Sequence, residues 1–264
     1  MVAMALAAVP PGAATILSGV LIALLGIPHG SLDLHLISTR NQRLRELVIY
    51  IIGISFVLGL WLAWPSIVLM LFLLNSAWHF GDCDLRTEHK LKPVLALVYG
   101  VSILTVLIDP RDPTIIGIIT MLIGHTIDAS VVSHDGTIRV LASALVIGIP
   151  LIGHNRAPYQ SVFAGLLIVA VSTVAPSLIA FTWYFVIVHS WTSMDRMRFH
   201  IDTKHPWTWR KLLVAAAPLS LLTYFAIAVS TMLISNTDTL SLLFIALSAL
   251  TLPHGRLFHR VYHA

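Results

Sequence analysis

The stretch AATILSGVLIALLGIPHG, residues 13–30, carries no charged side chain over its whole length. Such a run is typical of a helix that crosses a lipid bilayer, which needs about 20 mostly apolar residues. It ends in Pro28-His29-Gly30, and the same tripeptide returns near the other end of the chain as Pro253-His254-Gly255. A histidine inside a membrane segment lowers stability unless it has a partner. These two tripeptides are therefore the first candidates for chemistry.

The composition of the whole chain indicates a polytopic membrane protein. Of its 264 residues, 57% are hydrophobic and 11% are charged, and apolar runs of this density exceed what a water-soluble core can bury. The formal net charge is +4, but Lys and Arg lie in short clusters between apolar runs. That is the pattern of topology signals, and it argues against nucleic-acid binding. The single cysteine, Cys83, excludes an internal disulfide.

The apolar runs are interpreted as helices, because a lipid-exposed backbone must satisfy its own hydrogen bonds and no alternating barrel pattern is present. The predicted fold is all-α, a transmembrane helix bundle that occupies residues 1–264 as a single domain. Its candidate segments are 13–36, 47–64, 67–81, 94–108, 115–132, 140–152, 162–174, 177–194, 212–234 and 240–258. Several are shorter than a perpendicular span, so we expect some to be tilted, broken or re-entrant.

The distribution of positive charge predicts the topology. Basic clusters follow the first, third, eighth and tenth segments, and the positive-inside rule assigns all four clusters to the cytoplasmic side. Ten full crossings do not satisfy this parity, whereas nine do if one weak segment between residues 115 and 174 is re-entrant or interfacial. We therefore predict about nine crossings, within a range of seven to ten, in the cell (inner) membrane. The N-terminus is then outside and the C-terminus is cytoplasmic.

Four histidines share one predicted depth in this bundle. Each lies in the last turns of a helix that descends toward one of the basic clusters, and they are His29, His79, His189 and His254. Imidazole is a good ligand for iron, zinc, copper and nickel, so this grouping predicts a catalytic metal centre held by all four. Four neutral imidazoles leave the charge of a ferrous ion uncompensated, which favours a neutral co-substrate such as dioxygen.

Three aspartates lie close to these histidines in the sequence. Asp33 comes one helical turn after His29, and Asp82 and Asp84 follow His79 closely. Carboxylates commonly accept a hydrogen bond from the ring nitrogen of a ligating histidine that does not bind the metal. We expect these aspartates to orient the metal-binding rings in this way.

Aromatic side chains are concentrated around two of the histidines. They are Trp78, Phe80, Phe181, Trp183, Tyr184, Phe185 and Trp191. One interpretation is a tunnel for an apolar substrate, and the other is ordinary packing against lipid or the helix core. Under either interpretation, the surroundings of the histidines are apolar.

The other histidines are weaker candidates. His125, with Asp128 one turn later, has three alternatives: a fifth ligand, a group that orients a ligand, or a polar contact in a short segment. His259 and His263 form an i, i+4 pair, but at the end of the chain beside Arg260 we expect them to face water. The rest fall at predicted helix ends or loops: His35, His89, His134, His154, His200 and His205.

Three classes of membrane protein compete with an iron-dependent oxygenase. A transporter would carry charged residues centrally in its spans, whereas the aspartates here lie near span ends. A diheme cytochrome would pair histidines at two depths, whereas these four share one. A microbial rhodopsin needs a lysine within a helix, and the four lysines lie in loops or at span edges.

The motifs around the histidines resemble those of the Brp/Blh family of membrane carotenoid oxygenases. They are GIPHGSLD (26–33), WHFGDCD (78–84), VHS (188–190) and LPH (252–254), and their order and spacing match across almost the whole chain. The first two are fairly specific, whereas the last two carry weight only through their order.

This resemblance implies an Fe(II)-dependent dioxygenase that cleaves β-carotene with dioxygen at the central 15,15' double bond, giving two molecules of all-trans-retinal. It assigns His29, His79 and His189 as iron ligands and His254 as the fourth. It also implies a substrate that enters from membrane lipid, and retinal hand-over to a rhodopsin. One position departs from the family pattern: Ser193 stands where a second histidine is expected one turn after His189. The alternatives are a divergent member that binds or cleaves another apolar isoprenoid, and a non-enzymatic membrane transporter.

Overall fold

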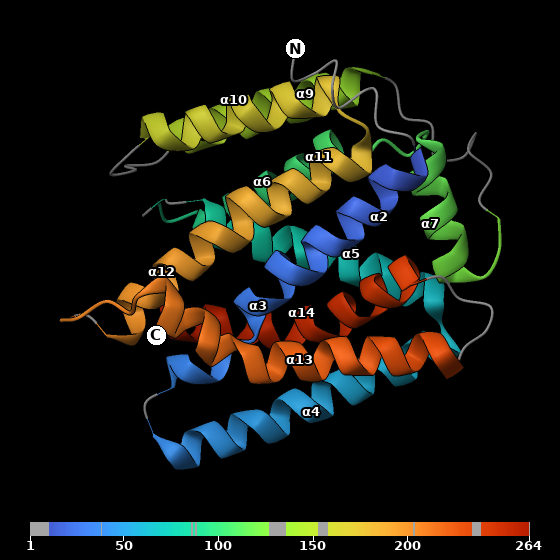
Figure 1. Ribbon diagram of the computed structural model, residues 1–264. Helices are drawn as coiled ribbons and strands as arrows, with labels where there is room; N and C mark the ends of the chain where they lie inside the picture. Colours follow the sequence, from blue (N-terminus) through green and yellow to red (C-terminus); the bar gives the residue numbers. More distant parts are fainter. Residues whose placement is uncertain are drawn as a thin grey trace. The chain divides into compact units, whose positions relative to one another are not determined.

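The computed structural model describes residues 11–263 apart from 38, 86, 88, 127–135, 153–157, 203 and 234–238. All regular structure in the described residues is helical, which confirms the predicted all-α class (Figure 1). The elements are α2 (Pro11–Leu21), η1 (Ile22–Gly26), α3 (Ile27–Gly30), η2 (Asp33–Leu36), α4 (Arg40–Ala63), α5 (Pro65–Asp84), α6 (Lys92–Leu107), α7 (Pro113–Ile123), α9 (Gly136–Gly148), η3 (Ile149–Leu151), α10 (Pro158–Val174), α11 (Ser177–Trp183), η4 (Tyr184–Ser190), α12 (Trp191–Ile201), α13 (Trp209–Leu233) and α14 (Thr239–His263).

Five of these helical stretches are long and apolar enough to cross a membrane. They are Gly12–Leu36, Arg40–Ala63, Pro65–Asp84, Trp209–Leu233 and Thr239–Tyr262. Four shorter apolar helices accompany them in the described part of the chain, at Lys92–Leu107, Pro113–Ile123, Gly136–Leu151 and Tyr159–Val174. The number of crossings and the orientation of the termini stay predictions.

The predicted segments coincide with helices, with one clear exception. The segment expected over 115–132 stops as helix α7 at Ile123, because Gly124 adopts a left-handed conformation with φ 76°. Glycine takes this conformation without steric cost and commonly ends helices in this way. At the other end of α7, the Asp112 side chain accepts from the backbone N–H of Thr114 and caps the helix. Residues 127–132 lie outside the described residues.

The described chain forms two compact units. Among the described residues, unit 1 comprises those within 11–18, 73–120 and 124–189, and unit 2 those within 19–72, 121–123 and 190–263. The organisation of residues 1–264 as a single domain stays a prediction.

Unit 1 contains a close helix pair formed by α5 and α6. A Cβ atom added to Gly81 would lie 1.7 Å from the carbonyl oxygen of Ala96, and one added to Gly100 would lie 1.7 Å from that of Ala77. The two backbones therefore meet through small residues spaced four apart on each helix, as is common in membrane proteins. His79 lies on α5 between the two contact points. Helices α9 and α10 pack along one another in the same unit and both contact α6 (Figure 1).

A partly buried polar cluster around Arg139 connects the ends of several unit 1 helices. The Arg139 guanidinium donates to the carbonyl oxygens of Val106 and Ser172, in the last turns of α6 and α10, and forms an ion pair with Asp109 at 3.1 Å. A guanidinium at helix C-termini satisfies carbonyl groups that have no partner within the helix. Hydrogen bonds from Arg111, together with the charge of Arg139, hold the pKa of Asp109 below its usual range.

Unit 2 is organised around helix α14, which packs on α4 and α13. The Glu46 side chain on α4 is fully buried and pairs with Arg256 and Arg260 on α14. A buried carboxylate is stable only when such partners compensate its charge. Further along the same two helices, Pro253 lies 3.7 Å from the position of a Cβ on Gly53. These contacts fix how α14 is registered along α4, and hence where His254 lies.

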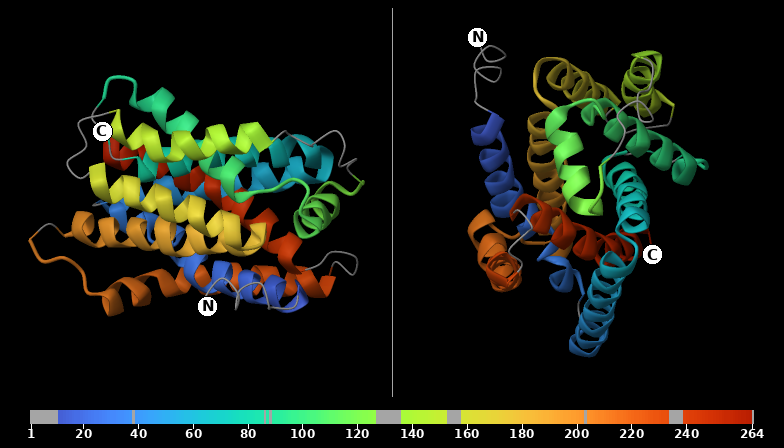
Figure 2. Two further views of the ribbon diagram at one scale, coloured as in Figure 1. Left: turned by 90° about the horizontal axis from the view of Figure 1, so that it is seen from above. Right: turned by 90° about the vertical axis from the view of Figure 1, so that its right-hand side faces the viewer.

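Two π-helical segments, η1 and η4, lie next to candidate histidines. In η1 the N–H of Ile27 bonds to the carbonyl of Ile22, five residues back, and Pro28 has no N–H to continue this pattern to Ala23. The Tyr224 hydroxyl instead donates to the Ala23 carbonyl at 2.9 Å. Segment η4 lies within one continuous helical ribbon that runs from α11 through α12 (Figure 2). Wide turns of this kind often occur at functional sites.

Candidate metal centre

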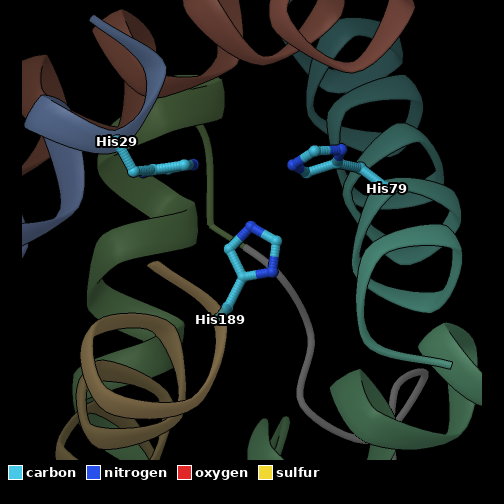
Figure 3. Close-up of side chains that lie close together, drawn as sticks. All are labelled: His29, His79 and His189. Atoms are coloured by element: carbon cyan, nitrogen blue, oxygen red, sulfur yellow. The ribbon is translucent and has the colours of Figure 1, made fainter. Parts of the chain in front are cut away.

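In unit 1, His79 and His189 form a buried histidine pair. His79 comes from α5 and His189 from η4, and their ring centroids are 4.9 Å apart with the planes inclined by 77° (Figure 3). His189 is fully inaccessible to solvent and His79 is 3% exposed. Two imidazoles this close, away from water, are a suitable start for metal ligation.

Asp84 faces the His189 ring. Its Oδ1 lies 3.4 Å from Nδ1 of His189, and its Oδ2 accepts a hydrogen bond of 2.7 Å from the Tyr184 hydroxyl. The carboxylate thus lies on the Nδ1 side of the imidazole. Nε2, on the opposite side of the ring, points away from this carboxylate.

Phenylalanine rings surround His189 on its other sides. Phe80 meets the imidazole edge-on at 4.7 Å between centroids, and Phe185 lies nearly parallel to it at 5.9 Å. Phe181 stacks on Phe185 at 5.8 Å, and Phe80 also contacts the ring of Tyr184. An aromatic enclosure of this kind keeps water away from the imidazole.

The remaining residues of the predicted tunnel are placed differently. Trp78 and Trp183 are half-buried, whereas Trp191 is 53% exposed and stacks on Trp209 at 4.2 Å. Of these three tryptophans, Trp191 therefore lies at the molecular surface.

In unit 2, His29 and His254 form the second buried pair. His29 comes from α3, and its ring meets that of His254 from α14 edge-on at 4.8 Å between centroids, with planes at 89°. Both side chains are almost fully buried. The Nδ1 atom of His29 donates to the Gly26 carbonyl and lies 3.3 Å from the Ser190 hydroxyl. Its Nε2 is therefore the nitrogen available to a metal.

Asp33 holds the His254 ring. Both carboxylate oxygens of Asp33 lie 2.8 Å from Nδ1 of His254, which donates to them, and the Tyr50 hydroxyl donates to Oδ2 of the same carboxylate. The aspartate is 1% exposed. A charge-assisted hydrogen bond in so dry a place fixes both the orientation and the tautomer of the imidazole.

The predicted aspartates thus lie near histidines, but with different partners from those expected. Asp33 was expected beside His29 and binds His254 on another helix, and Asp84, expected beside His79, has its Oδ1 3.4 Å from Nδ1 of His189. The expectation relied on spacing along one helix, and the observed contacts join different helices.

The third aspartate and the cysteine complete the environment of α5. Asp82 forms an ion pair with Lys92 at 3.7 Å, across the close α5 and α6 contact. The Cys83 sulfur lies 3.5 Å from Nδ1 of His79, one turn before it on the same helix. Sequence reasoning gave Cys83 no role near a candidate ligand, although its spacing of four residues from His79 carried that signal.

The secondary candidates do not join either histidine pair. His125 is exposed just after α7, and His259 is exposed on α14. Asp128, His134, His154 and the side chain of His263 lie outside the described residues. Ser193, at the position where the resemblance implies a second histidine, is buried on α12.

The donor set suits a first-row transition metal. Nitrogen ligands from neutral imidazoles bind Fe(II) well, and in His29, His189 and His254 a carbonyl or carboxylate already occupies the Nδ1 side. The residues present therefore fit an iron ion bound through Nε2 atoms.

Comparisons with known proteins agree with the motifs. The family model described as Beta-carotene 15,15'-dioxygenase matches residues 20–261. A relative named Beta-carotene 15,15'-dioxygenase, from an uncultured marine bacterium (66A03), is 25% identical over 264 residues, covering 89% of each chain. No solved structure matches. The matched residues include both histidine pairs, and the chain belongs to the beta-carotene 15,15'-dioxygenase family.

Proposed function

We propose that this protein cleaves β-carotene oxidatively at its central 15,15' double bond, using dioxygen and giving two molecules of all-trans-retinal. The observation that carries the proposal is the presence, in each unit, of two buried histidines, one of which has an aspartate carboxylate on its Nδ1 side. Membership of the family and the name of the relative support the substrate and the reaction.

The proposed cofactor is Fe(II), held by His29, His79, His189 and His254. When bound, iron supplies the one-electron chemistry that dioxygen needs to react with a closed-shell polyene. The aspartates orient the imidazole rings from their Nδ1 side, and the short hydrogen bond between Asp33 and His254 limits rotation of that ring. His254 takes the fourth position in this proposal, because Ser193 has no imidazole.

The apolar surroundings are proposed to select the substrate. Phe80, Phe181 and Phe185 offer flat, water-free surfaces beside His189, and a polyene packs well against such rings. The reaction breaks the C15=C15' bond and adds one oxygen atom of dioxygen to each carbon, so it needs no external reductant. A lipid-soluble substrate is proposed to enter from the surrounding membrane.

The proposal is tested by expressing the protein in a bacterium that makes β-carotene. We expect loss of the yellow colour together with two molecules of retinal for each β-carotene consumed, measured by liquid chromatography. The matched control is His259→Ala, because His259 lies exposed on the same helix as His254. A folded, iron-loaded protein that leaves β-carotene intact would refute cleavage of this substrate.

A further inference from the structure

Two tyrosines occupy equivalent places in the two units. The Tyr184 hydroxyl donates to Oδ2 of Asp84, whose Oδ1 faces His189, and the Tyr50 hydroxyl donates to Oδ2 of Asp33, which binds His254. Each unit therefore contains a Tyr, Asp and His in contact, in that order. The sequence motifs around the histidines do not contain Tyr50, and they do not predict that a tyrosine bonds to each aspartate.

Each tyrosine is held in place by the helix packing of its own unit. Tyr184 is fully buried, and its ring packs edge-on against Phe80, one turn before Asp84 on α5. On α5, therefore, Phe80 packs against the phenol ring, and Asp84, one turn later, accepts the hydrogen bond from its hydroxyl. The hydroxyl then has a single well-defined direction.

Tyr50 lies in a stripe of α4 that faces α14. Glu46, one turn before it, pairs with Arg256 and Arg260, and Pro253 lies 3.7 Å from the place a Cβ on Gly53, one turn after it, would occupy. Residues at these spacings share one face of a helix. The contacts on both sides hold the Tyr50 hydroxyl against Asp33 while α14 carries His254.

The chemistry of a buried carboxylate gives these hydroxyls a role. A carboxylate can accept several hydrogen bonds, and one that is not held can rotate away from the imidazole it serves. A phenol donor on one oxygen restrains that rotation and leaves the remaining acceptor capacity directed at Nδ1 of the histidine. The ring is then held with Nδ1 toward the carboxylate and Nε2 on the opposite side, where the proposed metal would bind.

We propose that Tyr50 and Tyr184 are positioning residues, which act through Asp33 and Asp84 to hold His254 and His189 with Nε2 presented to the metal. This inference rests on the proposed function, since it needs the histidines to be ligands. Neither tyrosine touches the substrate in this role. Tyr184, which is also one of the residues of the predicted substrate tunnel, directs its hydroxyl to Asp84.

The experiment compares Tyr50→Phe and Tyr184→Phe with controls that lose a buried hydroxyl elsewhere. Ser248→Ala removes the acceptor of a 2.6 Å hydrogen bond from Trp61 between α4 and α14, and Thr182→Val removes a hydroxyl two residues before Tyr184. Full-length proteins in detergent are titrated with Fe(II) against a competing chelator. The visible absorption spectrum of the Co(II)-loaded proteins is recorded as an independent signature of ligand geometry.

Each phenylalanine variant should bind Fe(II) about tenfold more weakly and shift the Co(II) bands. Both control variants should match the wild type. In a protein that already carries Asp33→Asn, adding Tyr50→Phe should change the affinity less than twofold, because the tyrosine acts through that carboxylate. If Tyr50→Phe acted only by lowering the stability of the protein, its effect on affinity would instead add to that of Asp33→Asn.

Phenylalanine variants with wild-type affinity and spectrum would overturn the positioning role while leaving the proposed function intact. An effect of Tyr50→Phe that persists undiminished beside Asp33→Asn would overturn it as well. A wild-type protein that binds neither Fe(II) nor Co(II) would instead refute the proposed function, and the positioning role with it. The two tyrosines belong to different units, so each is a separate test.

Discussion

The two histidine pairs share one plan, but their surroundings differ. In unit 2, Asp33 binds His254 through both oxygens at 2.8 Å, and hydroxyl groups lie nearby, with Ser220 donating to Ser31 at 3.0 Å. In unit 1, Asp84 lies 3.4 Å from His189, and the ring is enclosed by phenylalanines. The His29 and His254 pair is held by charge and hydrogen bonds, and the His79 and His189 pair by aromatic packing.

This difference indicates a division of labour. A histidine fixed by a short charge-assisted hydrogen bond suits firm metal anchoring, whereas a histidine among aromatic rings suits contact with a hydrocarbon. We therefore expect changes in unit 2 to affect mainly iron binding. Changes to the aromatic residues of unit 1 should affect mainly the use of the substrate.

The largest expected effect is that of His254→Ala. With Ser193 in place of a second histidine in the third motif, loss of His254 removes the fourth proposed ligand, and iron and retinal formation should both fall below detection. Iron is measured by elemental analysis and retinal by chromatography. Adding Ser193→His to the same protein should restore part of the iron, while His259→Ala alone should change neither quantity. Full iron content in His254→Ala would remove that histidine from the ligand set.

The aspartates should differ in the size of their effects. Asp33→Asn should weaken iron binding by about 10–100-fold, because it replaces a charged acceptor on His254 Nδ1 with a neutral amide. Asp84→Asn should have a smaller effect, close to the lower end of that range, because its contact with His189 is longer. Chelator competition measures both affinities. Equal losses in the two variants would contradict the proposed difference between the pairs.

The phenylalanines of unit 1 should separate substrate use from metal binding. Phe185→Ala removes the ring that lies parallel to His189, and we expect kcat/KM for β-carotene to fall by roughly tenfold or more with the iron content unchanged. Phe185→Leu keeps most of the apolar volume and should lose less. Loss of iron in Phe185→Ala would show that the aromatic enclosure also supports ligation.

The smallest effects concern the helix packing that carries the ligands. Gly100→Ala places a methyl group against the Ala77 carbonyl and should lower the free energy of unfolding by about 1–3 kcal/mol, as overpacking does. Gly117→Ala, at a position with open space around it, is the matched control. Thermal unfolding in detergent measures both. An unchanged Gly100→Ala protein would mean that α5 and α6 separate easily, and that His79 is not held by their contact.

Much of this architecture was predictable from the sequence, for identifiable physical reasons. The apolar runs predicted the helices, because backbone groups in lipid leave no other solution. The break at Gly124 was missed because hydropathy alone does not detect a left-handed residue. Burial of His29, His79, His189 and His254 was expected from their position in apolar helices.

The contacts between helices were beyond sequence reasoning. Spacing along a helix assigned Asp33 to His29, whereas packing of η2 against α14 brings it to His254. Tyr50 carries no signal in its local sequence, since only the register of α4 on α14 places its hydroxyl near Asp33. Such partners depend on three-dimensional packing, which periodicity does not encode.

The most direct test of the proposed metal centre is to measure iron content and activity on the same protein. The wild-type protein, purified from cells grown with iron, should contain about one iron per chain and should form retinal from β-carotene in detergent or lipid. Chelation should abolish both, and Fe(II) should restore both. A protein that carries no iron yet forms retinal, or that keeps stoichiometric iron after loss of His189 and His254 together, would contradict the four-histidine iron site.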